Sequence, residues 1–295
     1  GNVKGHSAEK RKRGLIRPYQ QPRRNLVSRG CFPSPSPKKM RPTMTVLTQA
    51  EISEFIDRAF AEDIGTGDIT SDNVIPADAR LRVALETRED IVVAGLDIAL
   101  ECFRKLVPDA KITKHCEDGD AIAAKDVLAV VEGNARGILT AERTALNTLQ
   151  HLSGIATTTR SYVAAMGNTT ARLLDTRKTL PGWRKMEKYA TRMGGAQNHR
   201  MGLYDGVMIK DNHIGVVGSI TECVKSARAA NLPKIEVECD TLDQVREATD
   251  AGADIILLDN MGPDMLRQAV AIVAGRCKTE ASGGVNLQTI GAIAA

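Results

Sequence analysis

The sequence ARLLDTRKTLPGWRKMEKYATRMGGAQNHRMGLYDGVMIKDNH, residues 171–213, decides the fold of this chain and indicates where it binds a ligand. A short apolar run ends in DTRK (175–178), and a second run, VMI (207–209), ends in KDNH (210–213). Cations therefore follow two consecutive strand candidates, at the carboxyl edge where an α/β sheet or barrel places its chemistry. We expect the ligand at this edge to be an anion with several charges.

The rest of the second half repeats this pattern. Short apolar runs that end in polar residues alternate with helix-like segments such as 220–230 and 242–251, which predicts a parallel sheet. The runs are 172–175, 206–210, 235–240, 255–260 and 278–284. Five strands are too few to close a barrel, so either the barrel is incomplete or other elements close it.

The first half of the chain predicts a small α+β domain. A Thr-x-x-Glu capping box at 48–51 begins an amphipathic helix. Residues 80–86 alternate between apolar and charged side chains, as a half-buried strand does. A helix is expected over 96–107, and further short strands over 111–116 and 126–131.

A long helix is predicted from Thr140 onward. Arg143 falls in its expected first turn, where a cation opposes the helix dipole unless an anion compensates it. We place the domain boundary at this helix, with an amino-terminal domain over 44–140 and a catalytic domain over 141–295.

The net charge of +4 comes from one end of the chain. Residues 1–43 hold twelve Lys or Arg against Glu9, whereas the remainder holds 28 basic and 35 acidic residues. This stretch is rich in Pro and Gly and lacks apolar periodicity, so we expect a disordered leader. Two interpretations stay open: an expression or read-through leader ahead of a start near Met44, or an arm that binds nucleic acid or a membrane surface.

Two compositional features bear on the compartment. No uninterrupted apolar stretch approaches the roughly 20 residues that cross a bilayer. The six cysteines are scattered, without a CxxC pair. They predict a reduced, cytoplasmic protein without a structural metal.

Charged side chains of both signs are expected at the carboxyl edge of the sheet. The acids Glu238 and Asp259 each end a buried strand candidate, and a structural, salt-bridged pair is their alternative interpretation. Opposed charges suit glycosyl transfer through an oxocarbenium-like state, because carboxylates stabilise the developing cation while cations hold an anionic substrate. The cations are Arg177, Lys178, His199, Arg200 and Lys210.

The turn Ser282-Gly283-Gly284 precedes a predicted helix over 286–293. Free N–H groups of small residues at a helix start bind anions, and late in a barrel this is the usual phosphate position. An ordinary loop is the alternative.

Longer segments carry a family resemblance: ERTALNTLQHLSGIAT (142–157), DTRKTLPGWRKMEKYA (175–190), GGAQNHRMGLYDGVMIKDNH (194–213), IEVEC (235–239), ILLDN (256–260) and EASGG (280–284). Together they closely resemble quinolinate phosphoribosyltransferase, also called nicotinate-nucleotide pyrophosphorylase (carboxylating). The likeness covers about residues 48–295 in the same order, and motifs of this length are highly specific.

The resemblance implies an α/β fold: an amino-terminal α/β sandwich domain followed by an open, incomplete α/β (TIM-like) barrel. The implied reaction takes quinolinate and phosphoribosyl pyrophosphate to nicotinate mononucleotide, pyrophosphate and CO2, in NAD biosynthesis. Mg2+ would accompany the phosphoribosyl donor near Glu238 and Asp259, without a dedicated metal site on the protein.

The resemblance also implies roles for single residues. Arg143 matches an arginine that reaches a neighbouring subunit's site, so a homodimer is expected. The turn 282–284 matches the one that holds the 5′-phosphate. The implied catalytic residues are Lys178, Lys210, Glu238 and Asp259. The implied substrate-binding residues are Arg143, Thr176, Arg177, Lys178, His199, Arg200, Lys210, Glu238, Asp259, Ser282, Gly283 and Gly284.

Some alternatives and departures stay open. Family members usually continue into a further strand after the helix that follows the SGG turn, so we expect a chain ending at Ala295 to have an impaired phosphate site. The rival functions are a related phosphoribosyltransferase of the nicotinate or molybdenum-transport type, a truncated inactive binding form, and a nucleic-acid-binding protein that works through residues 1–43. The acidic body and the 3% aromatic content argue against the last.

Overall fold

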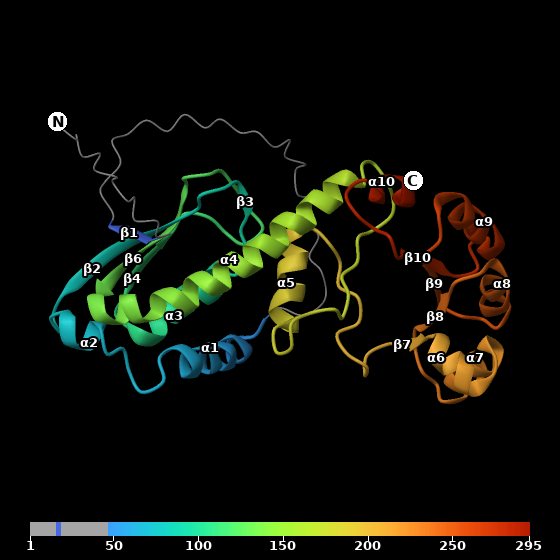
Figure 1. Ribbon diagram of the computed structural model, residues 1–295, viewed down its shortest axis with the longest axis horizontal. Coiled ribbons are helices and arrows are strands. Elements are labelled where there is room, and N and C mark those ends of the chain that lie inside the picture. Colours follow the sequence, from blue (N-terminus) through green and yellow to red (C-terminus); the bar gives the residue numbers. More distant parts are fainter. Residues whose placement is uncertain (1–15, 19–46) are drawn as a thin grey trace, which may run out of the picture. The chain divides into compact units, whose positions relative to one another are not determined.

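The computed structural model describes residues 16–18 and 47–295, and the chain divides after Thr157 into two compact units (Figure 1). The first unit contains an antiparallel sheet with strand order β1-β2-β6-β4 and a two-stranded sheet, β3-β5. Its strands are β1 (Ile16–Pro18), β2 (Arg80–Glu86), β3 (Ile91–Val92), β4 (Lys111–Lys114), β5 (Ala121–Ile122) and β6 (Val127–Asn134). Its helices are α1 (Gln49–Asp63), α2 (Ser71–Val74), α3 (Leu96–Leu106) and most of α4 (Ala135–Ala165).

Local signals account for the elements of the first unit. The capping box predicted for α1 is present: the backbone N–H of Glu51 donates to Thr48 Oγ1 (3.2 Å), and that of Thr48 donates to Glu51 Oε2 (2.9 Å). Helix α3 follows Gly95, which has a φ of +84° and lies so close to α4 that a Cβ there would be 2.6 Å from Leu152. Its buried face includes Phe103, which solvent does not reach.

Helix α4 starts earlier than the sequence predicts. It begins at Ala135 rather than Thr140, because Asn134 Oδ1 accepts a hydrogen bond from the backbone N–H of Gly137 (3.2 Å) and caps the first turn directly after β6. Arg143 is therefore well past the first turn, and it is exposed. The argument that it opposes the positive end of the helix dipole does not hold, since that effect fades beyond the first turn.

The first unit also extends further along α4 than the expected boundary near residue 140. The backbone N–H of Val92 donates to Thr157 Oγ1 (2.9 Å), and that of Ala94 donates to Ser153 Oγ (3.1 Å). These hydrogen bonds give partners to two backbone N–H groups in the segment that leads into α3, and they attach α4 to the first unit as far as Thr157. The sequence could not show this, because the partners are about 60 residues apart.

Within the predicted leader, the structure describes three residues, Ile16–Pro18. Within the stretch 1–43, for which the sequence predicts disorder, β1 pairs with residues 83–85 of β2 in antiparallel register. Ile16–Pro18 therefore form a strand where disorder was predicted. The pairing covers an edge of β2 that would otherwise be exposed to solvent. The remaining residues of the leader lie outside the described part of the chain.

The second unit contains a parallel sheet with strand order β10-β9-β8-β7. Its strands are β7 (Val207–Ile209), β8 (Ile235–Cys239), β9 (Ile255–Asp259) and β10 (Lys278–Ser282). Its helices are α5 (Arg184–Gly194), α6 (Asp211–Val217), α7 (Ile220–Ala229), α8 (Leu242–Asp250), α9 (Pro263–Val273) and α10 (Ile290–Ala294). Among the described residues the sheet is open, which confirms the predicted α/β class with an incomplete barrel.

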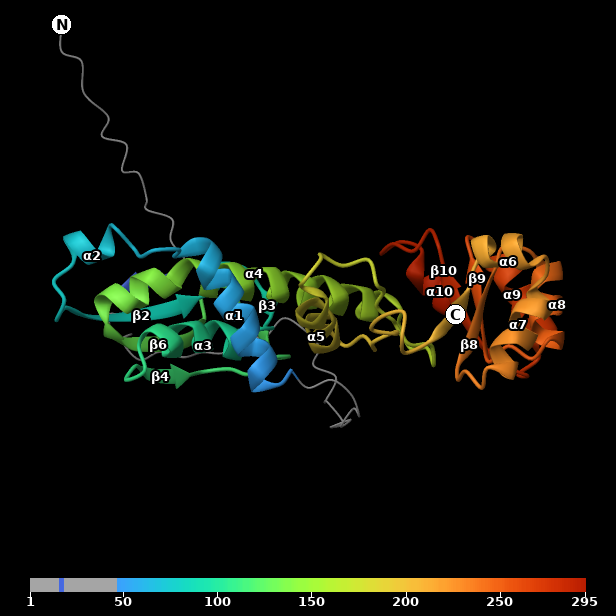
Figure 2. The ribbon, with the colours of Figure 1, turned by 90° about the horizontal axis from the view of Figure 1, so that it is seen from below.

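The two faces of the parallel sheet have different neighbours. Helices α7, α8 and α9 cover one face (Figure 2), and Val237 and Ile256 are fully buried there in the apolar core. Because side chains alternate along a strand, Glu236 and Glu238 point to the opposite face. The strand register also places Glu238 and Glu280 at one level, on either side of β9. Carboxylates therefore line the face opposite these helices, where the barrel interior would be.

One predicted strand is not a strand. Residues 172–175 make an isolated parallel bridge between Leu174 and Gln197 and do not join the sheet at β7. The sequence cannot reveal this, because an apolar run shows the tendency to pair but not its partner.

Two further findings concern membranes and thiols. In the described ranges no helix is both long and apolar enough to cross a membrane. The cysteines of the same ranges are free thiols, and Cys102, Cys116, Cys223 and Cys239 are buried.

Candidate active site

A pocket of about 460 Å3 lies at the carboxyl end of β7. Arg177, Arg200 and Lys210 line it, so three of the five predicted cations meet in one cavity, although up to 33 residues separate them in sequence. The Nε atom of Arg177 is buried and has no hydrogen-bond partner among the described residues. A buried donor without a partner is costly, and a buried polar atom of this kind in a cavity-lining arginine is typical of a binding site.

Lys210 and Glu238 form an ion pair across β7 and β8. Lys210 directly follows β7 at the start of α6, where its backbone N–H donates to His213 Nδ1 (3.0 Å). The Lys210 side chain is 41% exposed and that of Glu238 is 17% exposed, so the pair opens to solvent on the lysine side. The structure thus brings one predicted cation into contact with one predicted acid.

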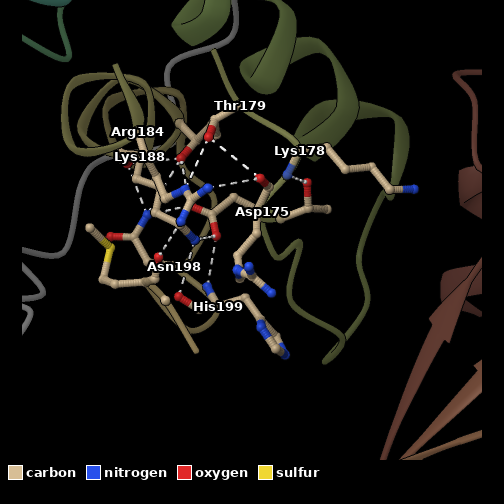
Figure 3. A network of polar contacts seen from close by, with 12 residues as sticks. Asp175, Lys178, Thr179, Arg184, Lys188, Asn198 and His199 are labelled. Atoms are coloured by element: carbon tan, nitrogen blue, oxygen red, sulfur yellow. Dashed lines mark hydrogen bonds and ion pairs between the residues drawn. The ribbon is translucent and has the colours of Figure 1, made fainter. Parts of the chain in front are cut away.

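Asp175 joins the two cation-bearing segments (Figure 3). Its carboxylate pairs with Lys188 Nζ and accepts hydrogen bonds from Asn198 Nδ2 (2.6 Å), Thr191 Oγ1 (3.2 Å) and the backbone N–H of His199 (2.8 Å). Asp175 therefore lies at the centre of a buried polar network that fixes the start of the DTRK segment next to the Asn-His-Arg segment.

Arg184 makes a second connection between the same segments. Its Nε donates to Thr179 Oγ1 (3.0 Å), and its NH1 group donates to the carbonyl oxygen of Met201 (3.1 Å). Arg184 and Lys188 were not predicted from the sequence as site-forming residues. They lie four residues apart on α5, and such a spacing is also typical of two solvated surface cations.

His199 lies outside the cation-lined pocket and contacts two carboxylates on the sheet face opposite α7, α8 and α9. Its Nε2 is 2.9 Å from Glu236 Oε2 and 3.6 Å from Glu280 Oε2. The hydrogen bond with Glu236 raises the pKa of His199, although burial opposes this. Burial, and then the neighbouring Glu236 carboxylate, raise the pKa of Glu280 to about 7.

Glu236 and Glu280 were likewise not predicted as site residues. The alternation in IEVEC (235–239) is a signal that places Glu236 on the face of Glu238. No comparable signal marks Glu280, because its pairing with His199 depends on tertiary structure.

Three further residues of the predicted site, Thr176, Lys178 and Asp259, have fewer contacts. Thr176 and Lys178 are exposed, and Thr176 Oγ1 accepts a hydrogen bond from the backbone N–H of Lys178 (3.0 Å). Figure 3 shows the Lys178 side chain pointing away from the Asp175 network. Asp259 Oδ2 accepts a hydrogen bond from Asn260 Nδ2 (2.6 Å). Asp259 is thus bonded to the next residue of its own strand end. The side chain of Lys178 points away from the polar network that holds the site (Figure 3).

The SGG turn has a tight backbone geometry. Gly283 has a φ of +82°, and a Cβ there would be 2.1 Å from Asn260 Oδ1 and 2.8 Å from Asn260 N. Only glycine fits such a close approach in this conformation. The prediction that the turn opens a helix is wrong, because α10 begins at Ile290 and Gly284 is held instead by a hydrogen bond from Thr289 Oγ1 to its carbonyl oxygen (2.9 Å).

Comparison with known proteins supplies the family. Two protein-family models match the chain. The model of the quinolinate phosphoribosyl transferase N-terminal domain matches residues 68–153, and that of the quinolinate phosphoribosyl transferase C-terminal domain matches residues 155–295. The chain is 42% identical over 241 residues to a nicotinate-nucleotide pyrophosphorylase [carboxylating] of Mycobacterium leprae, covering 79% of this chain and 84% of the relative. It is 40% identical over 261 residues to a chloroplastic enzyme of the same name from Arabidopsis thaliana, covering 81% and 74%.

The fold is similar to that of a solved relative. The structure of nicotinate-nucleotide pyrophosphorylase from Francisella tularensis matches with a TM-score of 0.80 and 39% identity, over 84% of this chain and 89% of that chain. The matches in sequence and in structure cover both units and agree with each other. The chain belongs to the quinolinate phosphoribosyltransferase family.

Proposed function

We propose that this chain transfers the phosphoribosyl group of phosphoribosyl pyrophosphate to quinolinate and releases pyrophosphate and CO2, giving nicotinate mononucleotide for NAD biosynthesis. The observation that carries the proposal is the meeting of Arg177, Arg200 and Lys210 in one pocket of an otherwise acidic body. Quinolinate has two carboxylates and the donor has several phosphates. Guanidinium groups bind such planar anions through paired N–H donors, and the buried Arg177 Nε supplies a donor without a protein partner among the described residues.

The ion pair of Lys210 and Glu238 supports a role in bond cleavage. As the bond from ribose to pyrophosphate breaks, positive charge develops on the sugar, and the carboxylates of Glu238 and Asp259 would stabilise it. Lys210 would hold a substrate anion and balance Glu238 while the site is empty. Lys178, which is exposed, would reach a substrate phosphate from outside the pocket.

Decarboxylation follows from the chemistry of the product. Once the ring nitrogen carries the ribose, its positive charge stabilises the electron pair that stays on C2 as the 2-carboxylate departs as CO2, and a proton from solvent then adds to C2 to give nicotinate mononucleotide. No Schiff base is needed, so Lys210 is assigned as a charge clamp. His199 and Thr176 are assigned to substrate binding, and residues 282–284 to the 5′-phosphate.

Mg2+ fits the oxygen donors of the site. Glu238 and Asp259 end neighbouring strands, and Mg2+ in phosphate-transfer sites binds one or two carboxylates together with substrate phosphates. When bound, the ion would neutralise charge on the departing pyrophosphate. A homodimer that brings Arg143 to the partner's site, and a cytoplasmic location, stay predictions from the sequence.

A product assay tests the proposal. The chain is mixed with phosphoribosyl pyrophosphate, Mg2+ and either quinolinate or nicotinate, and both CO2 and nicotinate mononucleotide are measured. We expect equal amounts of the two products from quinolinate and none from nicotinate. Turnover of nicotinate alone would overturn the substrate assignment, and calorimetric binding of quinolinate without turnover would overturn the catalytic one.

A further inference from the structure

His199 occupies a position between two acidic strands that the binding of substrate anions does not by itself explain. Its Nε2 is within hydrogen-bond distance of Glu236 on β8, and Glu280 on β10 approaches the same nitrogen from across β9. The Glu236 side chain is 4% exposed and that of His199 is 15% exposed. This arrangement buries one imidazole against two carboxylates, outside the pocket that Arg177 and Arg200 line.

The contact at Nε2 constrains the protons on the ring. A carboxylate that receives a hydrogen bond from Nε2 requires a hydrogen on that nitrogen. Nδ1 has no hydrogen-bond partner among the described residues. In a neutral ring Nδ1 would present a lone pair, which repels a carboxylate or phosphate. In a charged ring Nδ1–H is a donor, which attracts either anion.

We propose that Glu236, assisted by Glu280, acts as a positioning residue that holds His199 as an oriented imidazolium ion, so that its Nδ1–H binds a substrate carboxylate at neutral pH. The inference rests on the proposed function for the identity of that carboxylate. The backbone position of the histidine comes from Asp175, which accepts a hydrogen bond from the His199 N–H (2.8 Å). The charge and the ring orientation come from the two glutamates.

The charges around His199 support this arrangement. Glu236 and Glu280 raise its pKa, whereas burial and the nearby Lys188 lower it. The effect of Lys188 is limited because its ammonium is paired with Asp175. Lys278, on the same strand as Glu280, acts on that carboxylate by favouring its ionised form. Among these influences, the hydrogen bond to Glu236 has the largest effect on the pKa of His199.

A metal ion is the competing occupant of this cluster. One atom each of His199, Glu236 and Glu280 lie within 4.8 Å of one another, a spacing that a divalent ion tolerates. Glu236 Oε1 is buried without a hydrogen-bond partner in the described part of the chain. A metal on Nε2 would displace the proton that this nitrogen shares with Glu236, so proton and metal exclude each other there. The two states are therefore distinguishable by one titration.

The experiment follows the histidine by NMR in the full chain, with ring-labelled histidine and without substrate. His199→Gln identifies the resonance by its loss. We expect the His199 pKa to lie above its usual 6.5, and Glu236→Gln to lower the proton affinity of the ring about tenfold or more. Glu280→Gln should cause a smaller decrease and serves if Glu236→Gln does not fold. Glu247→Gln, which removes a carboxylate bonded to Thr221, is the matched control.

Two results would overturn the proposal: a His199 pKa at or below 6.5 in the unchanged chain, or the same decrease in Glu247→Gln as in Glu236→Gln. Loss of the Nε2 proton of His199 on adding one equivalent of the diamagnetic ion Zn2+ at neutral pH would assign the cluster to a metal instead. The titration needs no turnover, so it stands even if the product assay fails. In an active enzyme, Glu236→Gln should raise KM for quinolinate increasingly as pH rises and leave KM for the phosphoribosyl donor nearly unchanged.

Discussion

The carboxylate of Asp175 and the ammonium of Lys188 form an ion pair that solvent barely reaches, because their side chains are 5% and 2% exposed. Lys188 Nζ also donates to the carbonyl oxygen of His199 (3.1 Å). The pair therefore connects the segment that carries Arg177 with the segment that carries Arg200. Buried polar groups of this kind hold a site rigid when every member has a partner.

We predict that breaking this pair destabilises the protein strongly. Asp175→Asn or Lys188→Met leaves one buried charge without its partner, which costs about 3–5 kcal/mol of unfolding free energy. The double variant should lose less than the sum of the two, because it leaves neither charge behind. Urea unfolding of the four proteins measures both effects.

The control is a surface pair in the same unit. Arg246→Ala removes the exposed ion pair with Asp243, and such pairs contribute about 1 kcal/mol or less. Strictly additive losses in the double variant would show that Asp175 and Lys188 stabilise the fold independently, and would contradict their action as a pair.

The sequence predicts the cations of the pocket but not the residues that hold them in place. Arg177 and Lys210 follow apolar runs, and the place of a cation just after such a run is a local property that the sequence displays. Lys188 lies on a helix whose pattern gives no sign that a lysine is buried. Its burial depends on Asp175, thirteen residues earlier, and thus on how residues 171–200 fold back on themselves.

The same reasoning explains the errors in the elements. The apolar runs at β7, β8, β9 and β10 were correctly predicted as strands, because each pairs in parallel with another such run. The run at 172–175 looks identical in sequence, yet it bridges Gln197. The early start of α4 depends on one side chain, that of Asn134, in a stretch where two glycines suggest a turn.

We predict that removing a pocket cation reduces catalysis. Arg177→Ala or Lys210→Ala should cost about 2–5 kcal/mol of transition-state binding, because each leaves a substrate charge without its partner. That loss corresponds to roughly 30-fold to several-thousand-fold in kcat/KM. Lys225→Ala, which removes an exposed lysine on α7, is the control and should keep the original rates. Near-normal kinetics in both pocket variants would remove these residues from the site.

We predict different effects for the two glycines of the SGG turn. Gly283→Ala places a Cβ against the backbone and side chain of Asn260, so the turn must move and KM for the phosphoribosyl donor should rise more than about tenfold. Gly284 has a φ of +63° and no atom within 4 Å of its Cβ position, so Gly284→Ala should add only backbone strain of about 1–2 kcal/mol. Equal KM values in the two variants would favour an ordinary loop over a phosphate site.

The pH dependence of stability has a defined sign near neutrality. Glu280 has a pKa raised to about 7 in the fold, so the folded state binds its proton more tightly than the unfolded chain does. Its stabilising effect is complete below the unfolded pKa of 4.5 and is lost as pH rises through about 7. The raised pKa of His199 acts in the same direction, from its unfolded value of 6.5 upward. The lowered pKa values of Asp205 and Asp254 have the opposite sign: they stabilise the fold near neutrality, and this contribution is lost only as pH falls below their unfolded value of 3.8.

We therefore predict that the free energy of unfolding decreases from pH 5 to pH 8, and that Glu280→Gln makes this decrease smaller, because glutamine does not titrate. Urea unfolding at intervals across that range measures the slope. Glu247→Gln, which keeps both Glu280 and His199, should retain the slope of the unchanged chain. If Glu280→Gln also retained the slope, the Glu280 carboxyl group would have to ionise as readily in the fold as in the unfolded chain, and neither its burial nor the nearby Glu236 would affect its protonation.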